Sequence, residues 1–232
     1  MINLDNLAVD MPKCIAMVGQ EQDIVNNHQE ARISIYESLI AGSIALRANN
    51  AEYEQVIPTI KAIIEWLRTN DFYTGPASTK YHESFHGGLL LHSLKVYNKM
   101  IELHALKSFQ KVAIASATLV ALTHDWCKIG KYESYFKNEK NPKTKIWEEK
   151  LAYRCTDKYL GLGHGPQSLM MLSQFCTTPL TNLSFDEMAA IRWHMYTYDV
   201  TSYDINDLNR CGNKIPLVVL TQFADQLAAG DY

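Results

Sequence analysis

Six residues of types that commonly bind transition metals lie in otherwise apolar stretches of this 232-residue chain. Two of them, His124 and Asp125, are adjacent and end the apolar run AIASATLVALTHD. The other four are His92 in GGLLLHSLKV, His164 in GLGHGPQSLMML, His194 in MAAIRWHMY and Asp225 in VVLTQFADQLAA. Imidazole and carboxylate groups are rarely buried unless they are paired or bound to a metal. These six residues are therefore candidate metal ligands.

The spacing of the candidate ligands indicates what kind of site they could form. Zinc-finger ligands come in close pairs such as C-x₂₋₄-C, whereas these five segments are separated by roughly thirty to forty residues. Helical bundles direct one or two ligands inward from each of several helices, which suits such separations. A single histidine on an apolar helix is more often a hydrogen-bonded core residue. The prediction of a metal site therefore rests on all six residues taken together and on none of them alone.

Helix-type periodicity dominates the chain and strand-type alternation is scarce, which predicts an all-α protein. We expect helices over residues 21–49, 53–69, 89–105, 109–125, 165–177, 185–196 and 216–229. Pro166 and Pro216 fit the first turns of two of them, and Ser184 with Glu187 predicts a capping box. Residues 71–86 are expected to form a loop. The lysine-rich residues 137–145 predict a surface loop that is either simply solvated or helps to hold an anionic substrate.

Composition and charge restrict the class of protein. The chain is 47% hydrophobic and 20% charged, which is typical of a soluble globular protein, and its net charge of −3 gives no overall nucleic-acid footprint. No apolar run is long enough for a membrane span, and we expect no secretory signal at the N-terminus. Five scattered cysteines without a C-x-x-C pair favour reduced thiols in a cytoplasmic protein.

The segments GGLLLHSLKV, LTHDWCK and FADQLAA together resemble the H…HD…D signature of the HD-domain metal-dependent phosphohydrolase superfamily. The resemblance covers roughly residues 80–230 and is closest to the branch of bacterial 3′-to-5′ exoribonucleases. The N-terminal residues here show no five-strand pattern of the OB-fold that those enzymes carry. The resemblance implies an HD-type helical bundle over residues 80–232, preceded by a helical extension over residues 1–79 that packs on it.

Carried over by position, the resemblance also implies roles for the ligands. His92, His124, Asp125 and Asp225 would hold a first metal, and Asp125 would bridge to a second metal held by His164 and His194. Imidazole and carboxylate ligands without thiolate suit Fe, Mn, Zn, Ni or Co, and make Mg²⁺ less favoured. We expect one or two ions of such a metal.

The expected reaction is hydrolysis of a phosphoester or phosphoanhydride by attack of metal-activated hydroxide on phosphorus. Asp125 and Lys128 are the expected catalytic residues, with Lys128 facing the substrate phosphate; alternatively, this lysine complements a helix dipole. His86 is a further candidate for substrate contact or a surface residue. The expected substrate is a phosphorylated small molecule or nucleotide, and a nucleic-acid end is also possible. Aromatic residues near the ligands could stack on a base or pack in the core: Tyr132, Tyr135, Phe136, Tyr196 and Tyr198.

Two other functions fit the same ligands. One is a di-iron oxygenase of the HD type, and the other is a metal-binding regulatory domain without turnover. The presence of Lys128 and the lysine-rich 137–145 segment favours an anionic phosphate substrate over oxygen chemistry. The oligomeric state is left open by the sequence.

Overall fold

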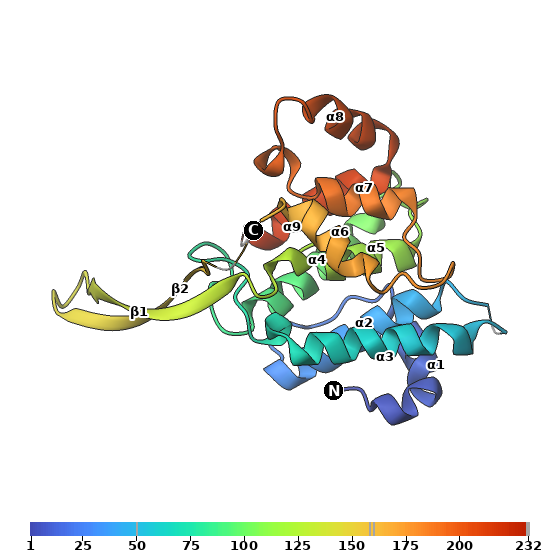
Figure 1. Ribbon diagram of the computed structural model, residues 1–232, viewed down its shortest axis with the longest axis horizontal. Helices are drawn as coiled ribbons and strands as arrows, with labels where there is room; N and C mark the ends of the chain where they lie inside the picture. Colours follow the sequence, from blue (N-terminus) through green and yellow to red (C-terminus); the bar gives the residue numbers. More distant parts are fainter. Residues whose placement is uncertain (50, 158, 160, 231–232) are drawn as a thin grey trace.

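The computed structural model describes residues 1–49, 51–157, 159 and 161–230, and over these residues the chain is mostly helical with one antiparallel β-hairpin (Figure 1). The longer elements are α1 (Leu7–Met17), α2 (Gln29–Ala45), α3 (Tyr53–Thr69), α4 (Gly88–His104), α5 (Ile114–Thr123), β1 (Tyr132–Lys140), β2 (Trp147–Cys155), α6 (His164–Ser173), α7 (Phe185–Trp193), α8 (Ile205–Lys214) and α9 (Pro216–Ala229). In this part of the chain, no helix combines the length and apolarity needed to cross a lipid bilayer. The expectation of a mainly helical protein is confirmed, with the hairpin as an addition.

The central part of the fold consists of α4, α5, α7 and α9. Helix α4 packs against α5 and α9, and α7 packs against α9 and α6. Fully buried aliphatic side chains such as Leu90, Val120 and Leu220 fill the space between these helices. Because α4 and α9 carry candidate ligands while α5 and α7 end at them, the packing of this core decides where the ligands meet.

Helices α1, α2 and α3 form a layer on one side of this core (Figure 1). Helix α2 contacts both α4 and α5. The buried Tyr36 hydroxyl donates to the carbonyl oxygen of Leu122 at 2.7 Å and accepts from Trp126 Nε1 at 3.0 Å. Buried hydrogen bonds of this kind fix the layer against the helix end that precedes Trp126. The N-terminal helices therefore pack on the core, while the division into an extension over residues 1–79 and a domain over residues 80–232 stays a prediction.

Several predicted helix boundaries are confirmed and others are wrong. Helix α9 has the predicted bounds, and Ser184 and Glu187 form the predicted capping box of α7. The helix predicted over residues 21–49 begins only at Gln29, where the His28 side chain caps it. Residues 21–28 are rich in Asp and Asn, whose side chains bond to nearby backbone and favour turns. Helices α1 and α8 were not predicted.

The hairpin projects from the helical body (Figure 1). Its register pairs Tyr132 with Cys155 at the base and Lys140 with Trp147 near the tip. The 137–145 segment predicted as a loop instead contains the end of β1 and the turn, and it lies at the outer end of the hairpin. Both faces of the arm meet solvent; Phe136 and Trp147 are each 66% exposed. Burial therefore imposes no clear alternation on the strands, which explains why they escaped prediction.

Candidate metal centre

His92, His124 and Asp225 bring their ligand atoms together inside the helical core. Oxygen Oδ1 of Asp225 lies 3.0 Å from His92 Nε2 and 3.8 Å from His124 Nε2. Both imidazoles are fully buried. His92 comes from the second turn of α4, His124 from the end of α5 and Asp225 from α9. This cluster could hold a metal ion.

Asp125 lies between this cluster and a third histidine. Its Oδ2 atom is 3.4 Å from His92 Nε2 and 3.5 Å from His124 Nε2, while Oδ1 is 3.6 Å from His194 Nε2. Burial raises the pKa of the Asp125 carboxyl, but the positive charge of Lys128 and contact with His124 outweigh this and hold the pKa well below its usual range. One oxygen of the ionised carboxylate thus faces two imidazoles and the other oxygen faces a third, as in a bridging ligand.

The local structure of two helix ends fixes which nitrogen of each imidazole is free. His124 and His194 are the C-terminal cap residues of α5 and α7. Their Nδ1 atoms lie 2.8 Å from the carbonyl oxygens of Ala121 and Ile191, which belong to the unsatisfied last turns of the same helices. A carbonyl oxygen only accepts hydrogen bonds, so each Nδ1 carries the proton.

The Nε2 atoms of these two histidines are consequently directed into the site. Both are buried and neither has a hydrogen-bond partner. Buried polar atoms without partners are rare, whereas metal-ligating histidines commonly bind through one nitrogen while the other donates to a carbonyl or carboxylate. The donor set therefore fits a divalent transition metal. At His194 a proton competes with the metal for Nε2, since burial lowers the pKa of this imidazole but contact with Asp125 more than compensates and raises it.

His164 lies on the wall of the same site but outside the cluster. Its side chain is about a quarter exposed, and its Nε2 atom is 3.1 Å from Lys131 Nζ. Burial lowers the pKa of His164 to about 4, so the neutral ring accepts a hydrogen bond from the lysine ammonium. Lys131 was not singled out in the sequence, because an exposed-looking lysine after a helix carries no distinctive pattern.

Lys128 lies beside Asp125, as its position three residues later suggests. A single turn of 3₁₀ helix, Trp126–Lys128, places its Nζ atom 2.6 Å from Asp125 Oδ2. The residue is only 8% exposed. Burial lowers the pKa of Lys128, but the charge of Asp125 more than compensates and raises it above its usual value. The lysine is thus a buried cation held at the site.

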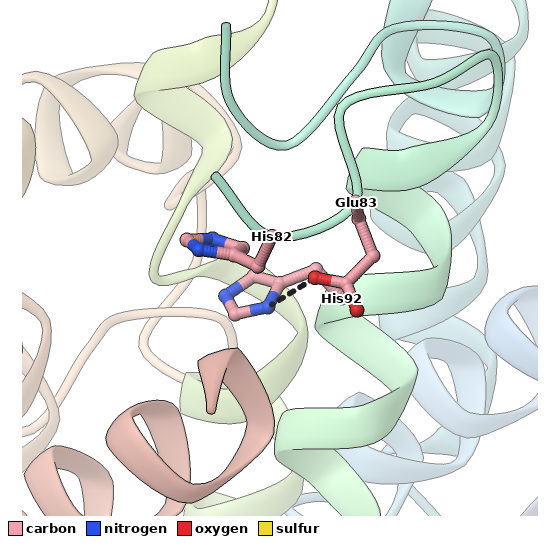
Figure 2. A group of neighbouring side chains, drawn as sticks. All are labelled: His82, Glu83 and His92. Carbon is pink, nitrogen blue, oxygen red and sulfur yellow. Dashed lines mark ion pairs between the residues drawn. The ribbon is translucent and has the colours of Figure 1, made fainter. Parts of the chain in front are cut away.

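Two residues that precede α4 also belong to the site, and a third does not. The ring of His82 lies 4.6 Å from that of His92, and Glu83 Oε2 lies 3.6 Å from His92 Nδ1 (Figure 2). His86, a candidate for either substrate contact or a surface role, is exposed and lines a separate hollow beside Tyr153. The loop has no periodicity that would single out His82 and Glu83. The adjacent His and Glu in YHESFHGG were the only available signal.

A cavity of about 420 Å³ opens onto the cluster. Lys128, Lys131, His164, His194 and Asp225 contribute its polar lining, together with His82. Its remaining wall is largely apolar or aromatic and includes three tyrosines: Tyr81, Tyr132 and Tyr198. Two of the five aromatic residues proposed from the sequence, Tyr132 and Tyr198, thus face this space. No described residue of the lysine-rich 137–145 segment is part of its lining.

Comparison of the chain with protein-family models, with curated proteins and with solved structures gives no match.

Proposed function

We propose that the protein is a metal-dependent hydrolase of phosphoester or phosphoanhydride bonds in a nucleotide, a dinucleotide or a nucleic-acid end. The observation that carries this proposal is the position of Asp125. Its two oxygens face His92 and His124 on one side and His194 on the other. The Nε2 atoms of His124 and His194 have no hydrogen-bond partner, and both face this carboxylate. The resemblance of these residues to the HD superfamily supports the same conclusion.

Each candidate ligand has a place in this proposal. His92, His124, Asp125 and Asp225 would hold a first ion, and Asp125, His194 and His164 a second one. A divalent Fe, Mn, Zn, Ni or Co ion bound here would supply a Lewis acid and lower the pKa of water toward neutrality. The imidazoles keep their donor atoms fixed because each Nδ1 of His124 and His194 is tied to its own helix.

The chain's own cations support a phosphate substrate. Lys128 and Lys131 both line the cavity, within reach of the proposed ligands Asp125 and His164. Ammonium groups in a partly buried site offset the charge that develops on phosphoryl oxygens during hydrolysis. The tyrosines of the cavity wall can pack against an organic group such as a nucleobase. An oxygenase acting on an uncharged substrate would have no use for two lysines in this position.

The test is turnover by the metal-loaded protein. Metal-free protein is loaded separately with Mn²⁺, Co²⁺, Ni²⁺, Zn²⁺ and Fe²⁺, and release of phosphate or mononucleotide is measured on a panel of nucleotides, dinucleotides and short oligonucleotides. His194→Ala and Lys128→Met should lose activity, whereas His86→Ala, a histidine outside the cavity, should retain it. Bound metal without turnover of any phosphate compound, or product that forms only with O₂, would contradict the proposal.

A further inference from the structure

Glu83 is a buried carboxylate for which the proposed reaction assigns no role. Its side chain is only 5% exposed. Oxygen Oε1 accepts a hydrogen bond from Lys95 Nζ at 2.6 Å, while Oε2 has no hydrogen bond and lies 3.6 Å from His92 Nδ1 (Figure 2). A buried charge that leaves one oxygen unsatisfied is costly, so this arrangement calls for a physical reason.

The backbone at Glu83 is held in an unfavourable conformation. Its φ angle is +43°, in the left-handed region that residues with a side chain rarely adopt. Its carbonyl oxygen accepts from the backbone N–H groups of Ala77 and Phe85. At Gly88, the first residue of α4, an added Cβ would lie 1.9 Å from that carbonyl oxygen. The close packing of loop and helix therefore fixes the conformation, and such strain is concentrated at functional sites.

His92 differs from the other two buried histidines at its Nδ1 atom. The Nδ1 atoms of His124 and His194 each have a carbonyl partner, but that of His92 has no hydrogen bond, and Glu83 is the carboxylate beside it. His92 lies inside α4, where backbone carbonyls are already used by the helix. A carboxylate from outside the helix is thus the available acceptor for this proton.

We propose that Glu83 is a positioning residue of the metal centre: when an ion binds, its carboxylate closes the 3.6 Å gap to His92 Nδ1, accepts the Nδ1 proton and directs the Nε2 lone pair at the ion held with Asp225 and Asp125. This inference rests on the proposed metal centre. Carboxylates in this position fix the tautomer of a ligating histidine and increase its basicity. The hydrogen bond from Lys95 occupies Oε1 and holds the carboxylate in place, so Oε2 is the oxygen that remains for the His92 proton.

Glu83 has a competing role to consider, as a metal ligand together with His82 and His92. Ligand atoms of His82, Glu83 and His92 all lie within 4.8 Å of one another and could themselves hold an ion. His92 would then have to bind metals through both nitrogens and give up both protons. One oxygen of Glu83 is also already occupied by Lys95. These two points favour the positioning role, and metal stoichiometry separates the two.

The experiment measures Co²⁺ binding to the full chain by calorimetry and by the visible absorption of the bound ion. Wild type, Glu83→Ala and Glu83→Gln are compared with Glu102→Ala, which removes an exposed Lys–Glu pair from α4, the helix that carries His92. The positioning role predicts a roughly 10- to 100-fold loss of affinity for Glu83→Ala at unchanged stoichiometry. Glu83→Gln should lose less, because the amide oxygen still accepts the proton, and the control should bind like wild type.

The possible failures are distinguishable. If wild type binds no Co²⁺, the proposed metal centre itself is wrong. If wild type binds and Glu83→Ala binds with equal affinity, only the positioning role is overturned. Loss of one ion per chain with unchanged affinity for the rest would overturn it in favour of Glu83 as a ligand. Thermal unfolding of the metal-free variants, followed by circular dichroism, shows whether any loss arises from unfolding; Glu83→Gln then remains as the variant that keeps the fold.

Discussion

Replacing Asp125 with asparagine should weaken both metal binding and the metal-free fold. The carboxylate pairs with Lys128, whose Nζ lies 2.6 Å from Oδ2 and which is only 8% exposed. Removing one partner of a buried ion pair usually costs about 3–5 kcal/mol, because the remaining charge stays buried without compensation. Asp225 remains near the lysine and raises its pKa as well. We therefore expect a loss near the lower end, about 3 kcal/mol of unfolding free energy.

The measurement is urea unfolding of the metal-free protein in the presence of a chelator. A shift of the midpoint at constant slope reports a change of stability rather than of the unfolded state. Lys128→Met removes the other charge, and Asp125→Asn/Lys128→Met removes both. If the two charges stabilise each other, the double variant should be more stable than the sum of the single losses predicts, by about 1–3 kcal/mol.

Metal binding gives the second half of the test. The variants lacking Asp125 should lose metal affinity whether or not Lys128 is present, since the carboxylate faces all three buried histidines. The double variant should therefore regain stability without regaining metal or activity. Full metal content in Asp125→Asn would refute the bridging role. Additive stability losses would refute the idea that the lysine is held by this carboxylate.

Three further outcomes are expected. Burial acts to lower the pKa of His92, but the nearby carboxylates more than compensate and raise it to about 9. The protonated ring therefore stabilises the folded metal-free protein. This contribution, about 3 kcal/mol, should be lost as pH rises from about 6.5 through about 9. Protein saturated with metal should lack this loss, because the ion replaces the proton; urea midpoints across that pH range check both. Gly88→Ala should push the loop that carries Glu83 away from α4 and His92, and so reduce both Co²⁺ affinity and thermal stability, the latter by about 1–3 kcal/mol. Tyr36→Phe should cost about 1–3 kcal/mol in urea unfolding, since it leaves Trp126 Nε1 without a partner, and Co²⁺ affinity should stay unchanged.

The sequence was sufficient to predict which imidazole and carboxylate groups meet inside the core, while their role as metal ligands stays a prediction. Imidazole and carboxylate groups at His92, His124, Asp125, His194 and Asp225 lie in apolar segments, and helix periodicity brings such residues inside. The prediction for His164 was less complete, because its distance from the cluster depends on the loop before α6 and on a hydrogen bond from a lysine. Local patterns do not encode contacts of that kind.

Glu83 and the hairpin could not be predicted, for two different physical reasons. The role of Glu83 depends on a backbone angle set by the approach of Gly88, a tertiary contact with no periodic signature. Both faces of the two strands meet solvent, and their partly buried residues follow no regular alternation, so the period-2 signal of a half-buried strand is missing. Their pairing arises from cross-strand contacts that only the folded arm reveals.

The hairpin has a consequence for how this protein can vary. Its first and last residues, Tyr132 and Cys155, pair directly across the two strands, so the chain leaves and re-enters the core at neighbouring points. All six candidate ligands lie before or after the hairpin in the sequence. Of the hairpin residues, only Tyr132 and Cys155 at its base line the cavity. The arm is thus a modular insertion: it could be shortened, lengthened or exchanged for another sequence while the ligand geometry stayed in place. Such a position allows the surface of the arm to change while the candidate metal centre stays the same.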